Sequence, residues 1–229
     1  MIDVIILQAK KLALMKIKIC LGSLFLLIAM SGFAQFEAAK QTYSAPDLKS
    51  EILKQKTVAI LPFDVSITYK RVPKHYDASA TKSEEESLKT DLQSSMFTYL
   101  LRKADKYSVT FQDPTRTNAL LKAKGLYDKL DLLTQDSICK ILGVDAVIKS
   151  NYQYEKTASE GGAIVKTVLF GGIGSKTGSG ALTLQIYNGE NGNLLWRFYK
   201  AMNDDVMSST DQLITRMMKK VSRNFPYEK

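Results

Sequence analysis

One stretch of the chain, Ala181–Lys200, constrains the fold more than any other part. Its residues alternate between apolar and polar types, which is the period of a half-buried strand, and two Asn-Gly pairs interrupt the alternation. Asn-Gly is the strongest short-range signal for a β-hairpin turn. The stretch therefore predicts two antiparallel strands, with Leu194, Trp196 and Phe198 on a buried face.

Other segments predict the rest of an α/β (α+β) fold. Gly143–Ser150 alternates in the same way, and Lys56–Phe63 has the composition of a buried strand that Pro62 ends. Apolar residues at helical spacing predict helices over residues 83–100, 113–123 and 135–142, and from about Asp204 onward. This order of elements predicts a single domain with a mixed, partly antiparallel sheet covered by helices.

The connections between these elements are also predicted. Ser83, with Glu86 three residues later, has the spacing of a capping box and is the candidate N-cap of the first long helix. Asp64–Ala80 is polar and predicts a surface loop, a place where functional residues are common. Residues 35–55 predict a flexible lead-in that ends in a short helix near Leu48–Leu53.

The N-terminal residues have the pattern of a secretory signal peptide. Two lysines precede an apolar stretch from Ile19 to Met30, and Gly32 and Ala34 supply the small residues of a cleavage site after Ala34. A single transmembrane anchor is the alternative. We expect cleavage because the apolar run is shorter than the roughly 20 residues that a membrane-spanning helix needs.

The chain is therefore expected to have three parts. Residues 1–34 are the signal peptide, with Met15 as the true start, residues 35–55 are the lead-in, and residues 56–229 form a single α/β domain. Cys20 precedes the apolar core and lacks the small residues that come before a lipid-attachment cysteine. We therefore do not expect a lipoprotein.

The composition argues against several classes of function. The net charge is +9 at pH 7 and becomes +6 without residues 1–34, and the lysines are scattered among acids, so no nucleic-acid-binding face is predicted. Cys139 is the only cysteine outside residues 1–34, and its place on an apolar helix face favours a small buried residue over a reactive thiol. His75 is the only histidine. We predict no enzymatic activity, no metal site and no cofactor.

The segment Glu160–Gly180 holds seven of the thirteen glycines around an apolar run. Its Gly174-Ser-Lys-Thr piece lacks the spacing of a phosphate loop, so nucleotide binding is not predicted. Two interpretations stay open, an ordinary long hairpin connection and an apolar excursion made for contact. The candidate contact residues are Ile164, Val165, Val168, Leu169, Phe170 and Ile173.

Four core motifs carry a resemblance to a known group of proteins. They are VAILPF at residues 58–63, LGVDAVI at 142–148, ALTLQIY at 181–187 and GNLLW at 192–196. Together they resemble the group of bacterial cell-envelope proteins that includes the curli-secretion channel lipoprotein CsgG, the penicillin-binding-protein activator LpoB and the N-terminal domain of TolB. The resemblance implies a TolB N-terminal-domain-like fold, and a place in the periplasm or at the outer-membrane periphery of a Gram-negative bacterium. The lipid-attachment cysteine of CsgG and LpoB is missing from this chain.

The leading hypothesis is a non-enzymatic exported cell-envelope protein, an assembly or accessory factor that acts through protein–protein contacts. Its partner would be an envelope protein or a second copy of the chain, with a membrane surface as a further candidate and no nucleic acid or small-molecule cofactor. The alternative is a membrane-associated oligomer resembling a curli-secretion channel subunit. The predicted contact surfaces are Glu160–Gly180 and the Asp64–Ala80 loop.

Overall fold

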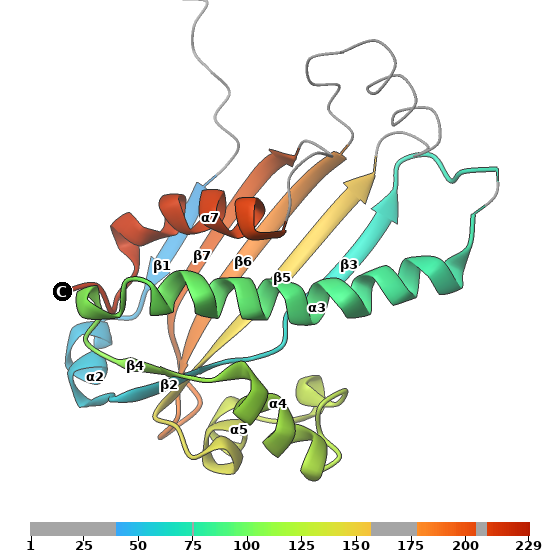
Figure 1. The fold of residues 1–229 in the computed structure, drawn as a ribbon. Coiled ribbons are helices and arrows are strands. Elements are labelled where there is room, and N and C mark those ends of the chain that lie inside the picture. The colour runs from blue at the N-terminus through green and yellow to red at the C-terminus, as the bar shows by residue number, and fades with distance from the viewer. Residues whose placement is uncertain (1–39, 75, 157–177, 205–209) are drawn as a thin grey trace, which may run out of the picture. The chain divides into compact units, whose positions relative to one another are not determined.

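The computed structural model describes residues 40–74, 76–156, 178–204 and 210–229. They form a seven-stranded mixed sheet with helices packed on it, which confirms the predicted fold class (Figure 1). The strands are β1 (Lys40–Ser44), β2 (Thr57–Ile60), β3 (Asp64–Tyr69), β4 (Thr110–Gln112), β5 (Ala146–Lys156), β6 (Gly178–Asn188) and β7 (Leu194–Asp204). The helices are α2 (Leu48–Lys54), α3 (Ala78–Leu101), α4 (Pro114–Ala123), α5 (Gln135–Leu142) and α7 (Thr210–Val221), with short 3₁₀ helices η1 (Ala104–Lys106), η2 (Leu130–Leu132) and η3 (Ser222–Asn224).

Strand β5 organises the sheet. The strand order is β1-β7-β6-β5-β2-β4, and β3 also pairs with β5. The first residues of β5, Ala146–Ile148, pair in parallel with β2, and Asn151–Lys156 pair in parallel with β3. On its other side β5 pairs antiparallel with β6, which forms the predicted hairpin with β7. The sheet is therefore parallel on one side of β5 and antiparallel on the other.

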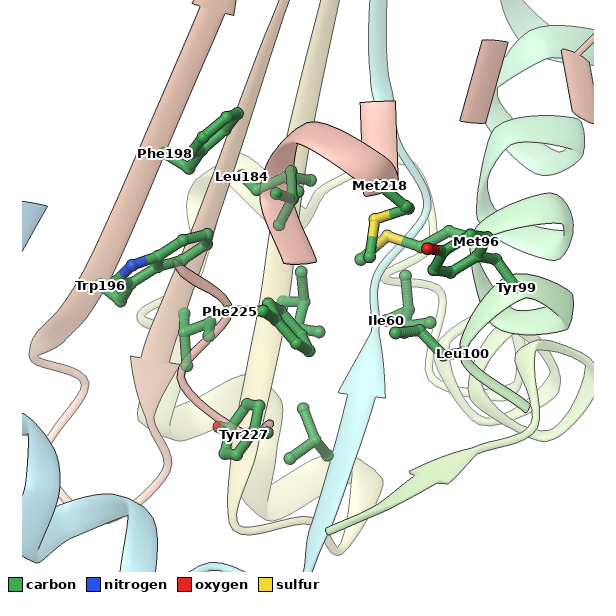
Figure 2. Close-up of a cluster of buried hydrophobic side chains, with 14 of the residues drawn as sticks. Ile60, Met96, Tyr99, Leu100, Leu184, Trp196, Phe198, Met218, Phe225 and Tyr227 are labelled. Carbon is green, nitrogen blue, oxygen red and sulfur yellow. The ribbon is translucent and has the colours of Figure 1, made fainter. Parts of the chain in front are cut away.

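The main core lies between one face of this sheet and the helices α3 and α7, which run across it (Figure 1). Trp196 stacks on Phe198 with ring centroids 5.9 Å apart and meets Phe225 edge-on at 6.0 Å. Met96 of α3 and Met218 of α7 point toward each other beside this cluster (Figure 2). The predicted burial of Trp196 and Phe198 is confirmed, since neither is more than 1% exposed.

The prediction that Leu194 is buried is wrong, because a β-bulge changes the alternation. Trp196 lies opposite Ile186, but Leu194 lies opposite the next residue, Tyr187, so β7 carries one extra residue. A bulge of this kind shifts the following side chains to the other face. Leu195 is accordingly the buried residue, at 1% exposure, and Leu194 is half-buried.

A smaller core lies on the opposite face, at the β2 end of the sheet. Consecutive strand residues point to opposite faces, so Ala59 and Val147 face away from the main core. They pack with Leu121 of α4 and with Ile138 and Leu142 of α5. The helices α4 and α5 therefore cover this end of the second face.

The beginning of α3 differs from its prediction. Asp77 is the N-cap, since its carboxylate accepts hydrogen bonds from the backbone N–H groups of Ser79 (2.8 Å) and Ala80 (3.2 Å). Ser83 lies inside the helix and is not the cap. The helix begins at Ala78, before the predicted start, because its first turns pack on β3. There the Glu85 carboxylate accepts the backbone N–H of Ile67 at 2.8 Å.

Three other boundaries are corrected. The first six residues of the predicted Asp64–Ala80 loop, Asp64–Tyr69, are strand β3. The lead-in contains the short helix as predicted, but its residues Lys40–Ser44 form strand β1 against β7 and are not a tether. Strand β7 runs to Asp204 and α7 begins at Thr210, later than predicted.

Candidate interaction surface

The second face of the sheet is open over β1, β7, β6, the end of β5 and β3. No helix of the described ranges covers it there, since α2, α3 and α7 pack into the main core on the first face and α4 and α5 lie at the β2 end (Figure 1). The strand registers define the residues that share this surface. They are Gln41 and Tyr43 of β1, Arg197 and Tyr199 of β7, Thr183 and Gln185 of β6, Lys149 and Asn151 of β5, and Asp64 of β3. We call them the open sheet face.

Burial separates the two faces along the same strands. Leu182, Leu184 and Phe198 are at most 1% exposed because they point toward α3 and α7. Their neighbours Thr183 and Tyr199 are half-buried, although they lie in the middle strands of the sheet. The open sheet face therefore presents side chains to solvent from a rigid, hydrogen-bonded backbone.

An arginine among tyrosines lies at the β1–β7 end of this face. The Arg197 guanidinium lies 6.0 Å from the centre of the Tyr199 ring, within cation–π range. Tyr43, 48% exposed, lies directly beside Arg197 on β1. The pKa of Tyr187 is raised by burial, and the nearby Arg197 charge opposes that rise. Gln185 donates to the Tyr187 hydroxyl at 2.9 Å, which holds this group in place.

The other end of the face is polar. The Asn151 side-chain amide donates to the Asp64 carboxylate at 2.8 Å and ties β5 to β3. Strand β1 is the last strand of the sheet on the opposite side, and all five of its residues are exposed. The open sheet face thus runs from a polar pair at β3 to aromatic and arginine side chains next to an exposed edge strand.

The candidate contact residues of the segment Glu160–Gly180 lie outside the described residues. This holds for Ile164, Val165, Val168, Leu169, Phe170 and Ile173, and also for His75. The structure does place the flanks of the segment, since Lys156 at the end of β5 pairs with Gly178 at the start of β6. The buried Lys156 ammonium lies 2.7 Å from the Glu84 carboxylate and over the Tyr69 ring at 5.5 Å. These contacts anchor the end of β5 to α3 and β3.

The three consecutive glutamates of α3 make separate contacts. Glu84 pairs with Lys156, Glu85 accepts from Ile67, and Glu86 pairs with Lys89 at 2.9 Å. Within the described ranges, no group of three histidine, cysteine, aspartate or glutamate side chains is placed to hold a metal ion.

Cys139 is a core residue, as the sequence predicts. Its side chain is 1% exposed and packs in the cluster under α4 and α5. Burial raises the pKa of its thiol to about 12, and the charges of Asp136 and Asp145 act in the same direction. Because the thiolate is the nucleophilic form, this thiol is inert at neutral pH.

The open sheet face was not among the sequence predictions. Its residues occupy the polar positions of alternating strands, and these are expected to face solvent in any half-buried sheet. The sequence signal for a binding surface is the type of residue at these outward-facing positions. Several of them are tyrosine or arginine, which are enriched at protein interfaces, although serine, lysine or glutamate would be enough for solubility. None of the helices in the described part of the chain is both long and apolar enough to cross a membrane.

Comparisons with known proteins give similar folds only. No protein-family model matches the chain, and no curated protein matches it significantly. Among solved structures, lipoprotein GNA1162 from Neisseria meningitidis is similar at 12% identity and a TM-score of 0.45, over 73% of this chain and 96% of the other. A PelC dodecamer from Paraburkholderia phytofirmans is similar at 12% identity and a TM-score of 0.38, over 83% of this chain and 97% of the other.

LpoB, one of the proteins named in the sequence resemblance, is also among the similar structures. Its C-terminal domain from Escherichia coli is 11% identical, with a TM-score of 0.31, over 69% of this chain and 93% of the other. The resemblance to CsgG and TolB stays a prediction. At these identities and TM-scores, the likenesses carry no argument about what this chain binds.

Proposed function

We propose that this chain is a non-enzymatic, exported cell-envelope protein that acts through protein–protein contacts, and that the open sheet face binds its partner. The observation that carries the proposal is the group formed by Tyr43, Arg197 and Tyr199. Tyrosine and arginine are the residue types most enriched at the energetic centres of protein interfaces. Here they stand half-exposed on paired strands, so little side-chain and backbone freedom is lost on binding.

The ionisable groups support contact over catalysis. General acid–base catalysis needs a group whose pKa lies near the working pH. Burial instead raises the pKa values of Cys139 and Tyr107 to about 12, and it also raises the pKa of Tyr227. Hydrogen bonds lower the pKa values of Asp77 and Asp136. These shifts all move the pKa away from neutrality.

The Gly-rich segment is proposed as a second contact region. Its six apolar candidate residues between positions 164 and 173 would add to the binding surface, because the segment connects β5 and β6, two strands of the open sheet face. Export rests on the signal-peptide pattern of residues 1–34. The periplasm or the outer-membrane periphery is the proposed location.

Affinity purification from envelope fractions tests the proposal. We expect Arg197→Glu to reduce recovery of the bound partner at least tenfold, because the substitution removes the cation and the contact with Tyr199. The matched control is Lys219→Glu, the same charge reversal on the exposed side of α7, which we expect to leave recovery unchanged.

A second arm removes residues 161–177, which leaves strand β6 complete. We expect the domain to stay folded by circular dichroism and to lose its partner. If the parent chain, the Arg197→Glu variant and the deletion variant all recovered equal amounts of partner, the proposed function would be contradicted.

A further inference from the structure

A pocket of about 440 Å³ opens at the other end of the sheet, between the last turns of α3 and the edge strand β4. A volume of this size is in the range of small-molecule sites. Apolar side chains form its walls, from α3 and from the chain leading into β4. They are Phe97, Leu101, Tyr107, Val109 and Phe111.

The floor of the pocket is rigid, and its rim is exposed. Tyr107 is 4% exposed, and its ring meets Phe111 and Phe225 edge-on at 5.6 and 5.7 Å. These contacts fix the floor to the main core. Leu101 at the rim is 59% exposed, so it leaves apolar area in water that a bound apolar group would cover.

The lining of the pocket carries one charged side chain. Lys56 is the only lysine, arginine, aspartate or glutamate among the residues that line the pocket. Its backbone N–H donates to the Asp145 carboxylate at 2.8 Å, which fixes the position of its main chain. The adjoining turn, Arg102–Lys106, holds three basic residues and one acid. An apolar pocket with a cation at its mouth is complementary to an apolar group that carries an anion.

We propose that this pocket binds a small amphipathic carboxylate, a fatty-acid-like molecule. Its chain would cover Leu101 and the aromatic walls, and its carboxylate would meet the Lys56 ammonium. An extended peptide fits less well, because the outermost strand β4 spans only Thr110–Gln112 before Pro114 begins α4, which leaves little edge for strand pairing. The pocket shares no residue with the open sheet face, so the inference does not rest on the proposed function.

The test is a fluorescence titration of the purified protein with dansylaminoundecanoic acid. We expect a saturable increase in dansyl emission that dodecanoate reverses. Lys56→Gln removes a charge-assisted hydrogen bond and should weaken binding about tenfold. Leu101→Ser should weaken it by a similar factor because it removes the apolar rim. Both residues are exposed, so neither change is expected to unfold the chain.

Matched controls lie on α2. Lys49→Gln and Leu53→Ser make the same chemical changes at exposed positions away from the pocket, and they should bind the probe as the parent does. Absence of saturable binding overturns the proposal, as does binding that neither pocket variant weakens. Displacement by dodecylamine as effective as that by dodecanoate overturns the assignment of a carboxylate.

Discussion

Trp196→Ala is expected to lower the free energy of unfolding by about 3–5 kcal/mol, the range for truncating a fully buried large aromatic residue. The side chain is 1% exposed and joins β7 to the C-terminal residues through its contacts with Phe198 and Phe225. A loss of this size is a large part of the roughly 5–15 kcal/mol that stabilises a typical domain. Urea unfolding followed by circular dichroism measures this loss of stability. Tryptophan fluorescence cannot report it, because the variant lacks the chain's only tryptophan.

The control for this prediction is Leu132→Ala. Leu132 is 75% exposed, so the change should alter stability by no more than about 0.5 kcal/mol. Similar losses for the two variants would contradict the assignment of Trp196 to the centre of the core.

Gly189→Ala is expected to cost about 3 kcal/mol because the hairpin turn packs directly on backbone. A Cβ atom at this position would lie 2.6 Å from the Asp145 carbonyl oxygen and 2.9 Å from the Cys139 Cβ. The backbone oxygen cannot move freely, since it accepts the Gly189 N–H at 2.8 Å. Equilibrium unfolding in denaturant measures this cost. The midpoint concentration should fall, while the dependence of the unfolding free energy on denaturant concentration stays the same.

Gly125→Ala separates this steric effect from backbone strain. Gly125 has a φ of +66° but no atom within 4 Å of its missing Cβ, so its replacement should cost only about 1–2 kcal/mol. If Gly189→Ala proved no more destabilising than Gly125→Ala, the close packing of the turn on Asp145 would be refuted.

The elements predicted from sequence are those with a strong local pattern. The β6–β7 hairpin has its two Asn-Gly pairs, and α4 has Asp113 before Pro114, where the Asp113 carboxylate accepts the Thr115 N–H at 2.6 Å. Helix α5 ends at Leu142, and the φ of +66° at the following residue, Gly143, explains why glycine stands there. In each case the residues at the boundary determine the local backbone conformation.

The missed elements depend on tertiary contacts. Strand β1 has no buried residue, so no hydrophobic pattern marks it, and it is a strand because β7 offers an edge for pairing. Strand β3 follows Pro62 within a polar stretch and is stabilised by β5 and by Glu85 of α3. Ser83 has the spacing of a capping box, but Asp77 is the N-cap because the first turns of α3 pack on β3.

The candidate site was hidden for a similar reason. Alternation along β5, β6 and β7 shows which residues face away from the main core, but not whether a helix covers them. The smaller core under α4 and α5 covers Ala59 and Val147, while Arg197 and Tyr199 stay open. This distinction depends on where the connecting helices lie, which the alternation along a strand does not specify.

Site-specific photocrosslinking in envelope fractions tests whether the open sheet face binds a partner. A benzophenone-bearing residue is placed at Tyr43 on the open sheet face or, as a control, at Lys219 on α7. Both side chains are exposed, so access of the probe is matched. We expect an adduct of one defined mass from position 43, absent from position 219 and lost when Arg197→Glu is added. Equal adduct yields from the two positions, or an adduct from position 43 that Arg197→Glu leaves unchanged, would contradict a partner-binding role for the open sheet face.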